Sequence, residues 1–173
     1  MEITAKNLVK IYGDRSVVND ISFNMNKGEV VCLLGPNGAG KTTTFYMVVG
    51  LVKPNSGQIL LDGKDISSWP MNIRAKAGIG YLPQEASIFR KLSVEDNLKL
   101  VLEMNEKLTV DEKKRKLEEL LTEFGVLKLR KYSAVSLSGG ERRRVEIARA
   151  LAASPDFMLL DEPTNDLDIP TLS

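Results

Sequence analysis

The sequence predicts an α/β fold: a parallel-sheet core, an antiparallel β segment ahead of it, and a helical segment inserted into it. Residues 30–34, "VVCLL", are a continuous apolar run, which is typical of a strand buried on both faces of a parallel sheet. Residues 2–25 alternate loosely between apolar and polar, with turn residues between the runs. Residues ~93–132 instead repeat apolar side chains at helical spacing.

Length and composition indicate an ordinary globular protein. The chain has 173 residues, of which 43% are hydrophobic and 27% charged, enough for one sizeable core or slightly more. With a net charge of only +1, the protein as a whole has little electrostatic attraction to nucleic acid or to an anionic membrane. No apolar stretch approaches the ~20 residues that span a bilayer, and the first residues lack a secretory signal pattern, so we expect a cytoplasmic protein.

Cysteine and histidine usage narrows the chemistry. The single cysteine, Cys32, lies in the apolar run 30–34, where we expect a buried, inert core thiol. The chain contains no histidine, which excludes histidine acid–base catalysis within it.

The remaining elements follow in chain order. A helix is expected from about Lys41 to Gly50, and short strands at 56–63 ("SGQILLDG"), 78–84 ("GIGYLPQ") and 157–163 ("FMLLDEP"). Three helix starts carry a capping residue with an acidic residue three positions later. These pairs are Ser93 with Asp96, Thr109 with Glu112, and Ser138 with Glu141.

A glycine-rich loop lies between the first buried strand and the first helix. "GPNGAGKT" at 35–42 matches the phosphate-binding pattern G-x4-G-K-[ST]. Phosphate oxygens need several inward-pointing N–H groups, and Gly35, Gly38 and Gly40 allow positive φ and place no Cβ in the way. Lys41 would add positive charge at the β- and γ-phosphates, and the Thr42 hydroxyl would bind Mg2+. The predicted nucleotide contacts are Gly35, Pro36, Asn37, Gly38, Ala39, Gly40, Lys41, Thr42 and Thr43.

Two carboxylates follow the last apolar strand. After a phosphate-binding loop, Asp161 is expected to help hold Mg2+, and Glu162 to polarise the attacking water as general base. Without that loop, an exposed strand end would explain the pair equally well.

A second glycine-rich helix start carries no lysine. Ser138, Gly139 and Gly140 precede a helix whose N–H groups we expect to be uncovered, which makes a second anion site. One chain cannot easily wrap both sites round one nucleotide, so this one would face a nucleotide held by another subunit. An ordinary helix cap is the alternative, although it would not need paired glycines.

These motifs together resemble the ATPase cassette of ABC transporters. "GPNGAGKT" would be its Walker A motif, "LSGGE" at 137–141 its signature and "FMLLDE" its Walker B motif. Their order, spacing and helical insertion are similar to the family's. The resemblance implies a P-loop NTPase (RecA-like) fold, ATP and Mg2+ as cofactors, and a homodimer in which Ser138 to Glu141 contact the partner's ATP.

The resemblance also assigns two residues outside the main motifs. Gln84 would be the Q-loop glutamine, which contacts Mg2+, contributes to catalysis and senses the membrane partner; otherwise it is a polar residue in a turn after Pro83. Tyr12 would stack on adenine, a role that suits an aromatic face; otherwise it is a strand tyrosine.

"YMVVG" and "PQEASIFRKLSV" resemble, more closely, the ATPase subunits of lipopolysaccharide exporters, over residues ~3–160. This implies a transport-coupled ATPase on the cytoplasmic face of the inner membrane, bound to two transmembrane permease subunits, without direct contact to lipid or nucleic acid. Residues 87–90 would line the docking groove, with Phe89 and Arg90 as anchors. An exposed loop pair is the alternative for those two.

The last residues differ from that pattern. "DEPTNDLDIPTLS" resembles the soluble ABC-F class, and Asp166 and Asp168 would form the D-loop. The sequence ends before the strand that carries the family's switch histidine, so we expect a marginally stable chain with poor turnover. Two alternatives therefore remain open. The chain could be an ABC-F-type translation-factor ATPase, or a truncated or chimeric fragment that binds ATP without efficient turnover.

The domain organisation expected from these motifs is one C-terminally incomplete cassette. Residues 1–92 would form the β subdomain and phosphate-binding core, 93–137 the helical insertion, and 138–173 the signature helix, the Walker B strand and the D-loop.

Overall fold

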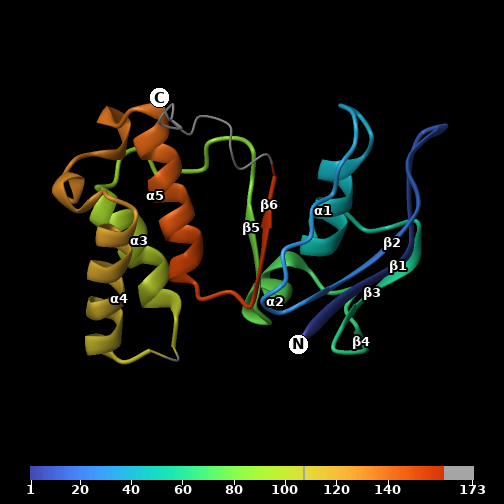
Figure 1. Cartoon of the computed structure of the whole chain (residues 1–173), viewed down its shortest axis with the longest axis horizontal. Coiled ribbons are helices and arrows are strands. Elements are labelled where there is room, and N and C mark those ends of the chain that lie inside the picture. The colour runs from blue at the N-terminus through green and yellow to red at the C-terminus, as the bar shows by residue number, and fades with distance from the viewer. Residues whose placement is uncertain (107, 162–173) are drawn as a thin grey trace. The chain divides into compact units, whose positions relative to one another are not determined.

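The computed structural model describes residues 1–106 and 108–161, which divide into two units (Figure 1). The first unit comprises Met1–Gly80 with Asp156–Leu159. The second comprises Tyr81–Pro155 with Leu160 and Asp161. Along the described residues, no helix combines the length and the apolar character needed to cross a bilayer.

A four-stranded antiparallel sheet forms most of the first unit (Figure 1). Its strands are β1 (Glu2–Tyr12), β2 (Arg15–Asn26), β3 (Ser56–Leu61) and β4 (Lys64–Asp65), in the order β2-β1-β3-β4. Ile3 pairs with Met25 on one side and Leu61 on the other. The alternation in the sequence buries one face, with Ile3, Ala5, Leu8, Ile59 and Leu61 in the core. The expected antiparallel β segment is confirmed.

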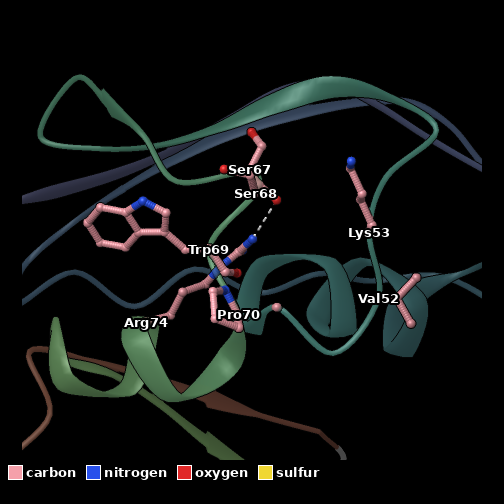
Figure 2. Close-up of a pocket in the computed structure, with 8 residues that line it drawn as sticks. Val52, Lys53, Ser67, Ser68, Trp69, Pro70 and Arg74 are labelled. Atoms are coloured by element: carbon pink, nitrogen blue, oxygen red, sulfur yellow. Dashed lines mark hydrogen bonds between the residues drawn. The ribbon is translucent and has the colours of Figure 1, made fainter.

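Two helices complete the first unit. Helix α1 (Lys41–Val49) contacts β1 and β2, buries Met47 to Val49, and ends at Gly50, whose φ of 85° closes it as a left-handed cap. Helix α2 (Met71–Lys76) carries Arg74, a buried guanidinium. Its nitrogens donate to four backbone carbonyls, those of Met47, Val48, Ser67 and Trp69 (Figure 2 shows the bond to Ser67). Two of these carbonyls end α1, where a positive charge complements the helix dipole.

The apolar run at 30–34 does not form the predicted strand. These residues have no regular secondary structure, Val30 and Leu34 are 89% and 88% exposed, and Cys32 is exposed. A strand forms only against neighbours that take up its N–H and C=O groups. In the described residues no strand pairs with this run, so the prediction of a buried strand and a buried Cys32 thiol is wrong here.

Strands β5 (Ile79–Leu82) and β6 (Phe157–Leu160) pair as a two-stranded sheet, and the division between the units crosses both. The Phe157 N–H donates to the Gly78 carbonyl (3.0 Å), and the Asp161 N–H donates to the Leu82 carbonyl (3.1 Å). Both partners advance in the same direction, so the pair is parallel. This pair is the parallel-sheet core within the described part of the chain.

Helices α3 (Val94–Met104), α4 (Val110–Glu123) and α5 (Gly139–Ala152) pack side by side in the second unit (Figure 1). Two 3-10 turns, Leu127–Leu129 and Ala134–Ser136, lie between α4 and α5. All three predicted caps form: the side chains of Ser93, Thr109 and Ser138 accept the N–H three residues on. The core between the helices includes Leu98, Leu102, Leu117, Leu121, Val145 and Ala148.

A buried carboxylate connects these helices. Glu95 of α3 forms ion pairs with Lys99, Arg130 and Lys131, and Arg130 also pairs with Glu118 of α4. The hydrogen bonds from Lys99, then those from Arg130 and Lys131, lower the pKa of Glu95 to about 2. The network ties α3 to α4 and to the turn that follows it.

Candidate nucleotide-binding site

The phosphate loop turns sharply before α1. The Ala39 N–H donates to the Pro36 carbonyl (3.1 Å), and Gly38 and Gly40 have φ of 80° and 85°. A Cβ on Gly40 would lie 2.3 Å from the Val17 carbonyl oxygen, so only glycine fits there. Gly35 does not have positive φ; a Cβ there would lie 3.2 Å from the Ala39 Cβ. The expectation of positive φ is confirmed at Gly38 and Gly40 and wrong at Gly35, because the chain reverses only after it.

The positive charge of the loop comes from Lys41, the first residue of α1. Its Nζ donates to the carbonyls of Gly35 (2.7 Å) and Pro36 (3.0 Å), so the ammonium is held against the loop. Gly40 is the N-cap and has no side chain to cover the helix start, while the Thr44 N–H and hydroxyl both donate to its carbonyl (2.8 and 2.9 Å). A helix N-terminus beside an ammonium can bind phosphate. Thr42 and Thr43 lie half-buried in this first turn.

Tyr12 ends β1 in the same unit and is 49% exposed. The Lys10 Nζ lies 5.1 Å from the centroid of its ring. The β1–β2 hairpin also supplies the Val17 carbonyl that Gly40 approaches, so the hairpin packs directly against the phosphate loop. An exposed aromatic face of this kind is able to stack on a base.

Two further predicted site residues, Gln84 and Asp161, follow the ends of the parallel strands β5 and β6 in the second unit. Asp161 follows β6, its carboxylate is buried, and the Tyr81 hydroxyl donates to it at 3.5 Å. Its backbone pairs with Leu82, and Gln84 lies two residues beyond Leu82, exposed. Because neighbouring parallel strands end at the same edge of a sheet, Asp161 and Gln84 follow strands that end at one edge. Glu162, Asp166 and Asp168 lie outside the described residues.

The signature segment begins α5 with a reciprocal cap. The Glu141 N–H donates to the Ser138 hydroxyl (3.3 Å), and the Ser138 N–H donates to the Glu141 carboxylate (2.8 Å). The backbone bond from Ser138, then its hydroxyl, lowers the pKa of Glu141. The expectation of an uncovered helix start is therefore too broad, since the N–H groups of Ser138 and Glu141 are used in the cap. Gly139 and Gly140 form the first helical turn.

The predicted docking anchors follow Gln84 in the second unit. Phe89 is 48% exposed, with the Arg149 guanidinium 4.9 Å from its ring centroid. Arg90 is also exposed, and its carbonyl accepts from the Ser133 hydroxyl and the Val135 N–H, both at 3.1 Å. An exposed aromatic ring on a fixed backbone is a suitable interface anchor.

Sequence reasoning missed three charged residues that contact this segment: Arg143, Glu146 and Arg149 of α5. Their only signal in the sequence is a spacing of three, which places them along one side of the helix. That spacing is also found on solvated helix faces, so the sequence alone could not reveal the burial of Arg143 and Glu146.

A small hollow of about 150 Å3 lies elsewhere in the first unit (Figure 2). It is lined by Gly50, Val52, Lys53, Ser67, Ser68, Trp69, Pro70 and Arg74, none of which is a predicted site residue. Ligand sites usually measure roughly 300–1,000 Å3, so this hollow is a poor candidate.

Comparison with known proteins assigns the family. The sequence model of the ABC transporter family matches residues 18–165. The chain belongs to the ABC transporter family. It is a P-loop ATPase of this class. The LptB proteins of Haemophilus influenzae and Escherichia coli K12, named as lipopolysaccharide export system ATP-binding proteins, are each 59% identical to this ABC cassette over 166 residues. Each alignment covers 96% of this chain and 69% of the relative.

Solved ABC cassettes have the same fold. One, described as the ATP binding subunit of an ABC transporter, superposes with a TM-score of 0.85 and 31% identity, covering 97% of this chain and 69% of that one. CbiO1 of Clostridium perfringens, described as part of the ABC transporter complex cbiONQ, superposes with a TM-score of 0.82 and 34% identity, covering 96% and 67%. The predicted fold class is confirmed.

Proposed function

We propose that this ABC ATPase energises the export of lipopolysaccharide. The observation that carries the proposal is the 59% identity, over 96% of the chain, to relatives named as lipopolysaccharide export ATP-binding proteins. The phosphate loop supports the ATP-binding part, because its two left-handed glycines and its lysine form a cradle for phosphate.

The donor set fits Mg2+. Thr42 offers a hydroxyl, Asp161 a buried carboxylate and Gln84 an amide oxygen, all of them oxygen ligands. Mg2+ usually takes one or two carboxylates together with substrate phosphates and water, so it needs no larger acidic cluster. When bound, Mg2+ neutralises charge that develops on the transferred phosphoryl group. In this proposal Glu162 accepts the proton of the attacking water, and Gln84 also contributes to catalysis.

Two copies of the chain would share each nucleotide. Lys41 and the phosphate loop of one copy bind the phosphates, with residues 35–43 in contact and Tyr12 stacked on the base. Ser138 to Glu141 of the other copy cover the same nucleotide, and Asp166 and Asp168 lie along the dimer seam. Binding of ATP closes the pair and hydrolysis reopens it.

The membrane part of the transporter would dock at residues 87–90, with Phe89 and Arg90 as anchors. Two transmembrane permease subunits are the partners, and the ATPase stays at the cytoplasmic face of the inner membrane without contacting the lipid. Within the cassette, we propose that residues 1–92 form the β subdomain and the phosphate-binding core. Residues 93–137 form the helical insertion, and residues 138–173 form the signature helix, the Walker B strand and the D-loop.

The test is reconstitution with transmembrane subunits of a lipopolysaccharide exporter in liposomes that contain lipopolysaccharide. We expect the chain to co-purify with them and to support ATP-dependent lipid release, while Lys41→Ala loses binding of a fluorescent ATP analogue and Lys64→Ala, a matched exposed lysine, keeps it. Undiminished binding by Lys41→Ala would refute the phosphate site. Co-sedimentation with ribosomes, without binding to the membrane subunits, would instead place the chain in the ABC-F class.

A further inference from the structure

Three charged side chains lie along one side of the signature helix α5, at residues 143, 146 and 149. Arg143 and Glu146 are only 4% and 2% exposed, so two charges are buried within the second unit. Isolated buried charges are costly, and such groups are found only where specific contacts compensate them. Here the contacts are with the segment 83–89, which runs from the end of β5 toward α3.

Glu146 is the centre of these contacts. One carboxylate oxygen accepts the backbone N–H groups of Ser87 (2.7 Å) and Ile88 (3.0 Å), and the other accepts from Arg143 Nη1 (3.3 Å). The same Nη1 donates to the Pro83 carbonyl (2.8 Å). Two side chains of α5 therefore hold the segment on both sides of Gln84, Glu85 and Ala86.

Arg149 extends the contact to the docking anchor. Its Nη2 donates to the Ser87 hydroxyl (2.8 Å), and its guanidinium stacks on Phe89. From α3, the buried amide of Asn97 accepts the Phe89 N–H (3.0 Å) and donates to its carbonyl (3.1 Å). The segment thus carries Gln84 near one end and Phe89 at the other.

The backbone of this segment is anchored by side chains. In sheets and helices, backbone groups satisfy one another; here a carboxylate takes the place of a neighbouring strand for Ser87 and Ile88. Replacing a buried ion pair with apolar residues is often neutral or stabilising, so stability alone does not explain the arrangement. The contacts of Arg143 and Glu146 instead fix the position of the segment on α5.

We infer that Glu146 is a positioning residue, which fastens the docking segment 83–89 to the signature helix so that a partner bound at Phe89 moves Gln84 and Ser138–Gly140 together. The inference rests on the proposed docking of membrane subunits. Coupling of this kind is reciprocal: if docking shifts the signature helix, the state of that helix alters docking affinity by the same factor.

Two variants separate the hydrogen bonds that Glu146 accepts from the segment from its charge and its pairing with Arg143. Glu146→Ala removes all of them, whereas Glu146→Gln removes the charge and the acceptor for Arg143 but keeps an amide oxygen that can accept from Ser87 and Ile88. The matched control is Glu119→Ala, which removes an exposed glutamate of α4 in the same unit. Docking to detergent-solubilised transmembrane subunits, ATP-analogue affinity of the free chain, and amide hydrogen exchange at Ser87 and Ile88 are measured for all three.

We expect Glu146→Ala to weaken docking about tenfold or more and to leave ATP-analogue affinity within about threefold of wild type, since the coupling acts through the segment. Exchange at Ser87 and Ile88 should accelerate about tenfold or more, because both lose a bond to a charged acceptor. Glu146→Gln should recover most of both effects, and Glu119→Ala should show neither. A residue important only for its charge would make Ala and Gln equally defective.

A double-mutant cycle with Phe89→Ala completes the test, because Glu146→Ala should weaken docking less in that background. Additive effects, equal defects in Ala and Gln, or unchanged exchange at Ser87 and Ile88 would each overturn the inference. A wild-type chain that does not bind the membrane subunits would refute the proposed function, and the anchoring would then be judged from exchange alone.

Discussion

Alanine at Gly40 gives a direct test of the phosphate loop. The substitution adds one methyl group at a residue with φ of 85°, where its carbon would lie 2.3 Å from the Val17 carbonyl oxygen. Ordinary contact begins at 3.4 Å, so the loop or the hairpin must shift by about 1 Å. A displacement of that size in a site that aligns reacting groups can cost about a hundredfold in rate.

Gly28→Ala is a matched control for backbone strain. Gly28 has φ of 86°, almost the value at Gly40, but a Cβ there would meet nothing within 4 Å. Both variants pay about 1–2 kcal/mol for holding alanine in the left-handed region. Only Gly40→Ala also has the clash, so the difference between them reports the effect of moving the loop.

The assay compares ATP-analogue affinity, turnover and urea unfolding of both variants with wild type. We expect Gly28→Ala to lose stability but to bind the analogue almost normally, and Gly40→Ala to bind it clearly more weakly and to lose up to about a hundredfold in turnover rate. If Gly40→Ala binds within about threefold of Gly28→Ala, the close approach to Val17 does not position the phosphate loop and the reasoning fails.

Two further predictions concern stability. The pKa of Glu95 is lowered from 4.5 to about 2, so its ion pairs stabilise the fold above pH 4.5 and lose this effect as the pH falls toward 2. Glu95→Gln should therefore lower the free energy of unfolding in urea by about 1–3 kcal/mol at pH 7. The loss should become progressively smaller in acid. A gap that stays constant with pH would contradict this. Arg74→Met removes the guanidinium donor from four carbonyls, of which only that of Met47 keeps another partner among the described residues, the Gly50 N–H, and it should cost about 3 kcal/mol or more in thermal unfolding. Arg115→Met, at a well-exposed site, should cost under about 0.5 kcal/mol, and equal losses would count against the role of Arg74.

Local signals in the sequence predicted local structure well. Ser93, Thr109 and Ser138 cap helices as expected because a cap depends on a few adjacent residues. The phosphate loop was predictable for the same reason: the turn, the left-handed glycines and the lysine lie within eight residues.

Structure that depends on distant partners was harder to predict. The run 30–34 has the composition of a buried strand, but a strand forms only beside another strand, and composition does not supply one. Gly35 was grouped with the glycines that allow positive φ from its place in a motif, whereas its constraint in the structure is the space beside the Ala39 side chain. Glu146 was missed because its partners, Ser87 and Ile88, are almost 60 residues away in sequence.

Gly40 and Glu146 represent two ways of fixing an irregular segment. At Gly40 the backbone is held by close approach, so the position tolerates no added atoms. At Glu146 the segment is held by a carboxylate that takes up two N–H groups, so the position tolerates no lost acceptor. The two therefore differ in which substitutions they accept: alanine is too large for the first and too small for the second, and an isosteric amide should satisfy only the second. The pattern of tolerated substitutions at the two positions therefore tests whether backbone position in each segment matters to function.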